Sequence, residues 1–306
     1  MRRILTALVI ILLLTLVNST YGMTIPNEIK KIVTFIFIQD KYGKIVPQGT
    51  GFFVGVKCQD NPDISFGYLV TAKHVLQNED KTAFLSTVYI RLNKKDNGSD
   101  LLRLDLILSG KNKNVFTHDD PSVDIAIVPT VPNDQKYDFR FLPEDFITKK
   151  DDFQKFNITE GSEVFFTGLF TPYIGNQRNN PIVRFGKLAL VTDEKIDFGG
   201  VKADLYLMEA SSYGGNSGSP VYFYLGIDRN PGSVILGNPV LKLAGIVSGR
   251  FNDIIPVQAI QTDVIPAVNP NTGIACVVPA YKIYDILFSD EMLKFRSSKS
   301  KLENKN

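Results

Sequence analysis

Short runs rich in Val, Ile, Leu, Phe and Tyr recur along most of the chain, and each is bounded by Gly, Pro, Asn or Asp. Several runs alternate apolar and polar residues, as antiparallel strands do when only one face is buried. Short strands at this spacing predict an all-β sandwich or barrel and not alternating β-α-β units. The runs cover residues 32–38, 49–56, 67–72, 86–92, 101–108 and 123–130, and then 163–170, 182–192, 203–210, 219–225, 242–249 and 273–279.

The stretch between the two sets of strands, residues 131–161, is polar and rich in turn-forming residues. A stretch of this kind is typical of a connection between two β subdomains. We therefore expect an N-terminal subdomain over residues 23–145 and a C-terminal subdomain, with a terminal helix, over residues 146–290.

The pattern changes at the C-terminal end. Apolar residues after Pro279 recur at helical spacing as far as Phe295, which predicts one or two helices. Residues 291–306 are expected to form a polar tail that is disordered from Arg296 onwards.

The N-terminal end has the layout of a secretory signal peptide. Positive residues 1–3 precede an apolar run over residues 4–17, and small polar residues follow. This run is shorter than the ~20 residues that a helix needs to cross a bilayer. We expect cleavage after Gly22 and an exported product, periplasmic or secreted. An uncleaved membrane anchor is the alternative.

Composition excludes several classes of function. The chain has 306 residues, 34 Lys and Arg, 32 Asp and Glu and a formal net charge of +2, so it has no charge bias towards nucleic acid. Its two His and two Cys exclude a three-His zinc site and a disulfide framework. No phosphate-binding glycine loop or spaced set of metal ligands is present in the sequence, and no cofactor is expected. Cys58 and Cys276 lie in predicted strands; buried free thiols are expected, although export would permit a disulfide.

Imidazole chemistry depends on one of the two histidines. His74 follows a predicted strand and precedes an apolar pair, whereas His118 lies in a polar loop and is expected to face solvent. Taken alone, His74 is interpreted as an ordinary packed side chain. Asp124 begins a strongly apolar strand, where a carboxylate needs a partner such as an imidazole N–H. Asp119 and Asp120 are rivals, but they lie in the polar loop.

Ser217 lies in a turn that three glycines surround. Gly214, Gly215 and Gly218 let the backbone adopt tight conformations that other residues resist. The simple interpretation is a flexible hairpin. The functional one is a turn that directs successive N–H groups into one concavity, as an oxyanion hole requires. A serine hydroxyl also needs an adjacent base, and His74 is the better anchored candidate.

Together these segments resemble those of the trypsin/chymotrypsin-like serine endopeptidases. VTAKHV, DIAIVP and GGNSGSPV match the three catalytic segments in the order His, Asp, Ser, with gaps of 50 and 93 residues between His74, Asp124 and Ser217. The style is closest to bacterial glutamyl-endopeptidase-like and DegP-like protease domains, with no PDZ domain expected. The resemblance implies two antiparallel six-stranded β-barrels, a polypeptide substrate and hydrolysis through an acyl-enzyme.

The resemblance also implies residue roles. Ser217 would be the nucleophile, His74 the general base and acid, and Asp124 the group that orients His74. The N–H groups of Gly215 and Ser217 would form the oxyanion hole.

The same resemblance assigns the substrate contacts. Ser248, Gly249 and Arg250 would lend their backbone to an extended substrate, and Ser248 would hydrogen-bond to Asp124. Ser211 would lie at the base of the primary pocket, where its lack of charge argues against a preference for Lys or Arg. Arg250 either favours an acidic side chain at the pocket mouth or points to solvent.

Two positions depart from the trypsin pattern. Asn216 stands where trypsin has an aspartate that pairs with a new N-terminal ammonium, so activation by N-terminal cleavage is not expected. Lys73 precedes His74, where a small residue is usual; close and buried, it would disfavour protonation of His74. The alternatives to a protease are a catalytically silent peptide-binding module of the same fold and a hydrolase of small esters.

Overall fold

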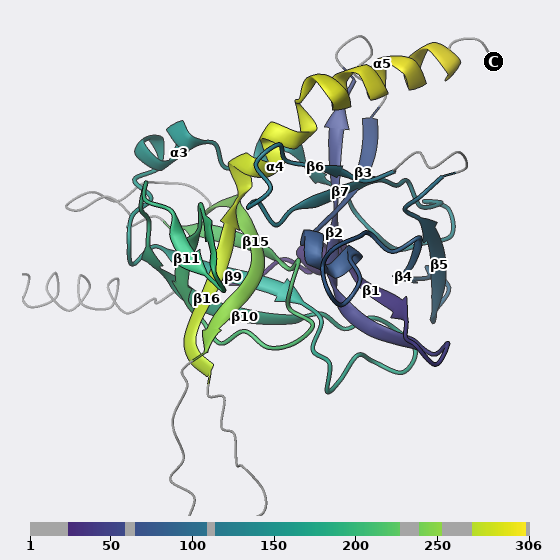
Figure 1. Cartoon of the computed structure of the whole chain (residues 1–306), viewed down its shortest axis with the longest axis horizontal. Helices are drawn as coiled ribbons and strands as arrows, with labels where there is room; N and C mark the ends of the chain where they lie inside the picture. Colours follow the sequence, from purple (N-terminus) through teal and green to yellow (C-terminus); the bar gives the residue numbers. More distant parts are fainter. Residues whose placement is uncertain (1–23, 59–64, 109–113, 227–238, 253–270, 304–306) are drawn as a thin grey trace, which may run out of the picture.

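A computed structural model describes residues 24–58, 65–108, 114–226, 239–252 and 271–303 (Figure 1). The expected signal segment lies outside these residues, so its fate stays a prediction. None of the described helices has the length and apolar character needed to span a membrane. In Figure 1 the strands of the N-terminal half lie on one side and β9, β10, β15 and β16 on the other, with α5 on the outside.

The N-terminal half is one eight-stranded sheet. Its strands pair in the order β5-β4-β1-β2-β3-β7-β6, and β8 pairs with β2 in parallel. We expected a closed six-stranded barrel here. The two edge strands, β5 and β6, do not pair with each other, so the sheet is not closed into a barrel. Near their ends, Asn114 N donates to Leu106 O at 2.8 Å. The elements are α2 (Asn27–Lys31), β1 (Val33–Gln39), β2 (Ile45–Lys57), β3 (Ser65–Thr71), η1 (Lys73–Leu76), β4 (Thr87–Asn93), β5 (Ser99–Asp105), β6 (Phe116–Thr117), β7 (Ala126–Pro129) and β8 (Leu142–Pro143).

The C-terminal half contains the closed six-stranded barrel that the sequence predicts. Its strands pair around the barrel in the order β10-β13-β16-β15-β14-β9, and β11 and β12 form a separate hairpin. Two short helices precede the barrel, η3 (Glu144–Phe146) and α3 (Lys150–Lys155). The strands are β9 (Glu163–Gly168), β10 (Ile182–Leu190), β11 (Ile196–Phe198), β12 (Val201–Ala203), β13 (Tyr206–Glu209), β14 (Pro220–Leu225), β15 (Val240–Asn252) and β16 (Asn271–Pro279).

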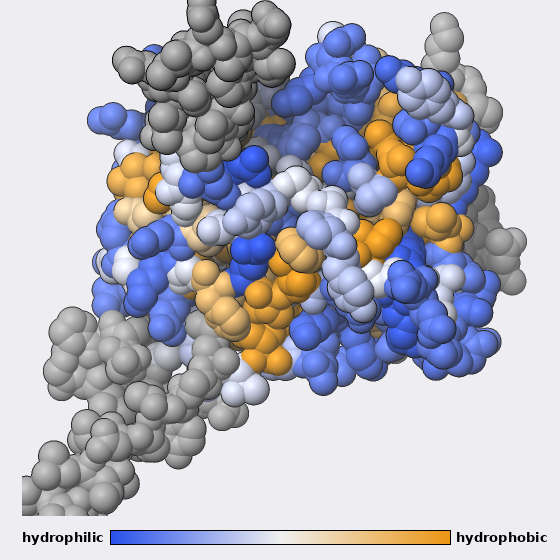
Figure 2. Space-filling model, turned by 90° about the horizontal axis from the view of Figure 1, so that it is seen from below, coloured by the Kyte–Doolittle hydropathy of each residue, from blue (hydrophilic) through white to orange (hydrophobic). Residues whose placement is uncertain are grey.

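Buried side chains join the two halves. One cluster contains Phe52 and Leu69 of the N-terminal sheet together with Phe165 and Tyr222 of the barrel, all fully buried. A second cluster, including Phe166 and Phe223, fills the rest of the barrel. Because burying one such side chain contributes about 1.5–3 kcal/mol, packing across the boundary favours one relative placement of the halves. Seen from below, the apolar residues that remain on the surface form separate patches among hydrophilic ones (Figure 2).

The polar C-terminal segment is helical, which corrects the expectation of a disordered tail. Helix α4 (Ala280–Leu287) is followed by α5 (Asp290–Glu303). Met292 is fully buried, and Arg296 is 7% exposed and donates to the Tyr68 hydroxyl at 3.3 Å. Phe295 contacts the ring of Phe116. A narrow stripe of contacts with the N-terminal sheet therefore holds a helix whose composition is mostly polar.

Both cysteines are free and buried, as the sequence predicts. Cys58 follows β2, and Cys276 lies in β16. Burial raises the pKa of the Cys276 thiol to about 12.

Candidate active site

His74 and Asp124 form a hydrogen-bonded pair at the end of β3. His74 lies in η1, directly after β3, and its Nδ1 is 2.7 Å from Oδ2 of Asp124. The main-chain N–H of His74 donates to Oδ1 of Asp124 at 3.0 Å. Because an ionised carboxylate only accepts hydrogen bonds, Nδ1 carries the proton and Nε2 is left as an acceptor. The carboxylate thus fixes both the orientation and the tautomer of the ring.

Asp124 is held as a carboxylate although it is largely covered, with 19% of its side chain exposed. Burial by itself raises the pKa of Asp124. The charge of His74 and the hydrogen bonds from the His74 ring, the Ser248 hydroxyl and the His74 main chain outweigh burial and hold this pKa below its usual range.

Neighbouring charged groups leave the pair undisturbed. The ammonium of Lys73 donates to Pro121 O at 2.7 Å in an exposed position, so the close, buried arrangement considered from the sequence is not present. Asp120, a rival for the role of Asp124, pairs with Lys195 at 2.9 Å. His118 is half-buried and not solvated as expected; its Nδ1 accepts from Asp120 N and its Nε2 lies 3.6 Å from Asp285.

Ser248 connects the pair to Ser217. Its hydroxyl donates to Oδ2 of Asp124 at 2.6 Å, as the sequence predicts. Its carbonyl accepts from the Ser217 hydroxyl at 3.4 Å. In the described part of the chain, Ser217 makes no hydrogen bond to His74. Ser248 thus bonds both to Asp124 and to Ser217. To reach Nε2 of His74, the Ser217 hydroxyl must rotate away from the Ser248 carbonyl.

Two tight turns shape the segment around Ser217. Asn216 N donates to Tyr213 O at 3.0 Å, and Ser219 N donates to Asn216 O at 2.9 Å. The third residues of these turns, Gly215 and Gly218, have φ of +91° and +83°, as type II turns require. A Cβ on Gly218 would lie 2.1 Å from the Thr50 carbonyl oxygen. Only glycine fits there.

The amides predicted for an oxyanion hole have no partner in the described structure. The N–H groups of Asn216, Gly218 and Ser219 donate to carbonyls, whereas those of Gly215 and Ser217 donate to no described residue. The turn that carries Ser217 thus has two N–H groups, two residues apart, that are available as donors to a developing oxyanion.

The strand predicted to bind substrate has an open edge. On one side, Gly249 and Arg250 pair with β16. On the other, pairing with the β14 segment ends at Val247, whose N–H donates to Ser219 O. Beyond it, no described strand pairs with Ser248 and Gly249 on this side, so an extended peptide can pair with their backbone there.

A cavity of about 750 Å³ adjoins this edge. It is lined by His74, Asp124 and Ser248, and also by Phe198 and Val201 of the β11–β12 hairpin. The ring of Phe198 lies on Gly249, where a Cβ would come within 2.7 Å of it. The hairpin thus forms one wall of the cleft, which the sequence did not predict.

Ser211, the predicted pocket base, differs from its neighbour in burial. Ser211 is exposed, whereas Ser212 is buried. The carbonyl of Ser212 accepts from Arg250 at 3.0 Å and from Asn271 at 2.7 Å. Neither serine lines the cavity beside His74, so the role of Ser211 stays a prediction. Arg250 turns towards this region and lies 5.9 Å from the ring of Tyr213.

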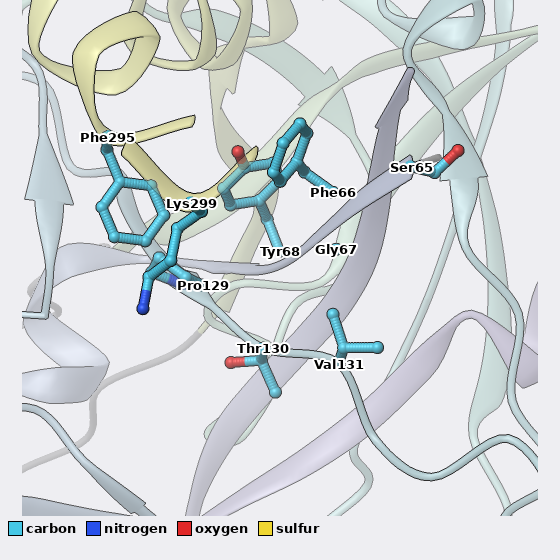
Figure 3. Close-up of a pocket in the computed structure, with 9 residues that line it drawn as sticks. All are labelled: Ser65, Phe66, Gly67, Tyr68, Pro129, Thr130, Val131, Phe295 and Lys299. Carbon is cyan, nitrogen blue, oxygen red and sulfur yellow. The ribbon is translucent and has the colours of Figure 1, made fainter. Parts of the chain in front are cut away.

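A second cavity lies far from this chemistry. It has a volume of about 240 Å³ and lies beside β3 and α5, where Phe66, Tyr68, Phe295 and Lys299 surround it (Figure 3). It contains none of the site residues predicted from the sequence. Elsewhere in the described ranges, no three His, Cys, Asp or Glu side chains are grouped to hold a metal ion.

Comparison with known proteins gives matches among solved structures alone. No family model and no curated protein sequence matches the chain. The apo MamO protease domain from Magnetospirillum magneticum is similar with a TM-score of 0.45 and 14% identity, over 84% of this chain and 96% of that one. Human heparin binding protein is similar with a TM-score of 0.46 and 9% identity, over 86% of this chain and 93% of that one.

The fold follows from the strand pairing itself. A closed six-stranded antiparallel barrel is joined to a second, mainly antiparallel sheet, and helices lie at the C-terminal end. This architecture agrees with the trypsin/chymotrypsin-like fold that the three sequence motifs predict.

Proposed function

We propose that this chain is a serine endopeptidase that cleaves peptide bonds through an acyl-enzyme. The observation that carries the proposal is the bonded His74–Asp124 pair, joined through Ser248 to a serine in a turn with two unpaired amides. Each part is needed for the same reaction, since a serine nucleophile requires a base, an orienting acid and stabilisation of an oxyanion.

The mechanism follows from these positions. Ser217 Oγ attacks the peptide carbonyl carbon as its proton passes to Nε2 of His74. The carbonyl oxygen becomes an anion and accepts hydrogen bonds from the N–H groups of Gly215 and Ser217. The intermediate then expels the amine, which takes the proton from His74, and leaves an ester on Ser217. Water, deprotonated by His74, cleaves this ester in the same way. Asp124 stays ionised throughout and stabilises the imidazolium.

The open edge at Ser248 and Gly249 supports an extended polypeptide as the substrate. Its backbone groups would pair with the substrate residues before the cleaved bond and place the carbonyl over Ser217. No nucleic acid, metal or cofactor takes part in the proposed reaction.

Export is a separate part of the proposal, and it rests on residues 1–22 alone. We expect an exported product, periplasmic or secreted, that begins after Gly22. Intact mass measurement of exported protein checks this, and a full-length mass in a membrane fraction would favour the anchor instead.

Labelling with a fluorophosphonate probe tests the catalytic proposal. The wild type should be labelled, Ser217→Ala should not, and His74→Ala should be labelled far more slowly. Ser297→Ala on α5, which changes an exposed hydroxyl bonded to Leu293 O, is the matched control and should label normally. No labelling of folded wild type would overturn the proposal.

One observation favours the silent peptide-binding module as second candidate. The Ser217 hydroxyl donates to Ser248 O instead of His74. If this arrangement persists in solution, Ser217 is not activated and peptides bind without being cleaved. Unlabelled wild type that binds an extended peptide, and loses that binding on Gly249→Pro, would support this candidate. Relative rates on peptides and simple esters separate the protease from an esterase.

A further inference from the structure

Four successive carbonyls around Ser217, those of Gly214, Gly215, Asn216 and Ser217, each accept a hydrogen bond. The donors come from the turn itself, from the segment after β9 and from β2 of the N-terminal half. Gly214 O accepts from Thr171 Oγ1 at 3.3 Å, Gly215 O from Thr50 Oγ1 at 2.8 Å, Asn216 O from Ser219 N at 2.9 Å and Ser217 O from Thr50 N at 2.9 Å.

These bonds determine where the amides point. All peptide bonds in the described chain are trans, so each N–H points away from the C=O of its own peptide unit. Holding Gly214 O therefore directs the N–H of Gly215 to the opposite side. Holding Asn216 O does the same for the N–H of Ser217. The two oxyanion donors of the proposed enzyme are thus oriented through their partner carbonyls.

Thr50 holds the other two carbonyls, Gly215 O and Ser217 O, and so fixes the peptide units on either side of the Asn216–Ser217 unit. It is fully buried, and its hydroxyl both donates to Gly215 O and accepts from Leu169 N at 2.9 Å. Its N–H donates to Ser217 O, and its own carbonyl accepts from Thr71 Oγ1 at 2.7 Å. One residue of the N-terminal sheet therefore holds the turn at two points.

Asn216 braces the same turn from within. Its side chain is fully buried; Oδ1 accepts from Tyr213 N at 2.8 Å, and Nδ2 donates to Leu169 O at 2.7 Å. Both ends of the amide are used, and neither bond requires a charge. Leu169 binds Thr50 through its N–H and Asn216 through its carbonyl. Thr50 and Asn216 therefore both bond to the residue that follows β9.

We propose that Thr50 and Asn216 are positioning residues that assemble the oxyanion turn within the folded chain, without a new N-terminal ammonium. The inference rests on the proposed function and concerns its regulation: the enzyme would be active as soon as it is folded.

Removal of the Thr50 hydroxyl tests the inference. Thr50→Val keeps the shape and the main-chain N–H, but it leaves Gly215 O without its donor and Leu169 N without its acceptor. A fluorogenic peptide selected from a library with wild type serves as the substrate. We expect kcat to fall about 10- to 100-fold with KM within threefold, because displacing donors affects the transition state and not substrate binding. Thr50→Ser should restore most of the kcat.

Thr34→Val is the matched control. Thr34 is also fully buried in the N-terminal sheet, and its hydroxyl donates to Arg91 O at 2.9 Å, away from the turn. Thr34→Val loses one buried hydrogen bond from a threonine hydroxyl to a carbonyl, where Thr50→Val loses that bond and a second one, and it should keep its kcat within twofold. Asn216→Asp keeps the acceptor for Tyr213 N but loses the donor to Leu169 O, and should also lower kcat at least tenfold.

Hydrogen exchange separates failure of this inference from failure of the proposed function. In Thr50→Val, amides of residues 213–219 should exchange at least tenfold faster than in wild type and Thr34→Val, whether or not the protein is active. Unchanged exchange in that segment, or an unchanged kcat in an active protein, would overturn the role of Thr50. An inactive wild type with faster exchange in Thr50→Val would overturn only the proposed function.

Discussion

Replacing Asp124 with Asn tests the proposed roles most directly, because the structure predicts how the new amide must lie. The main-chain N–H of His74 faces Oδ1 and can only donate. The oxygen of the new side-chain amide must therefore take the Oδ1 position, since the reverse orientation sets two donors together at a cost of about 1–3 kcal/mol. The amide NH₂ then takes the place of Oδ2, next to Nδ1 of His74.

This orientation reverses the tautomer of the imidazole. The NH₂ group donates to Nδ1, so the ring carries its proton on Nε2 and has no lone pair there for the Ser217 proton. Where the rest of a triad is kept, loss of the correct tautomer lowers kcat about 10⁴-fold. At 1.36 kcal/mol for each tenfold change, this is about 5.4 kcal/mol of transition-state stabilisation.

The assay compares the rate of fluorophosphonate labelling and kcat on a fluorogenic peptide for wild type, Asp124→Asn and Ser248→Ala. Ser248→Ala removes one donor to Oδ2 but keeps the carboxylate, and we expect a loss of about tenfold, since a hydrogen bond to a charged group contributes about 1.5–3 kcal/mol. Circular dichroism checks that each variant is folded. Folded Asp124→Asn with a rate within tenfold of wild type would refute the assigned role of Asp124.

Three further predictions concern stability and reactivity. Gly218→Ala should lower the free energy of unfolding in urea by about 3 kcal/mol or more, because its φ is +83° and the new Cβ would lie 2.1 Å from Thr50 O; a shift under 1 kcal/mol contradicts the turn geometry. Cys276, with a thiol pKa of about 12, should react with a thiol reagent at pH 8 only after unfolding, when two thiols per chain should titrate without reductant; one or none would indicate a disulfide. The pKa of Asp124 is lower in the folded chain than the unfolded value of about 3.9, so the ionised carboxylate stabilises the fold. This stabilisation is complete above the unfolded pKa and is lost as pH falls through the folded pKa. The free energy of unfolding should therefore fall more steeply below about pH 4 in wild type than in Asp124→Asn.

The long strands could be predicted from the sequence because each has enough residues to show its pattern. All twelve runs correspond to strands in the structure. The missed strands have two or three residues, too few for a period to appear. The β11–β12 hairpin did carry a turn signal, since Gly199 and Gly200 both have positive φ, but only three residues pair on each side.

Helix α5 shows the opposite failure. Its sequence is rich in Lys, Ser and Glu and has no broad apolar face. What holds it is long-range contact: Met292 enters the core, and Arg296 binds the hydroxyl of Tyr68 in β3. Local composition contains no information on such a partner, so the sequence predicted a disordered tail.

The candidate site divides in the same way. His74, Asp124 and Ser217 could be found because their chemistry demands particular residue types within recognisable local segments. Thr50 was not found, because a threonine between two glycines of a strand has no distinctive chemistry, and its partner Gly215 lies 165 residues away. The residues proposed to react were visible in the sequence, whereas those proposed to position them appear only when the chain is folded.

The proposed mechanism needs both halves of the chain at once. The N-terminal half supplies His74, Asp124 and Thr50, and the C-terminal half supplies Ser217 and Ser248. The bonds that join the catalytic groups, from Ser248 to Asp124 and from Thr50 to the Ser217 turn, cross the boundary between the halves. A shift of about 1 Å at this boundary would move base and oxyanion donors relative to the nucleophile, and such a displacement costs about 100-fold in rate. Loosened packing between the halves should therefore lower activity before it unfolds either half.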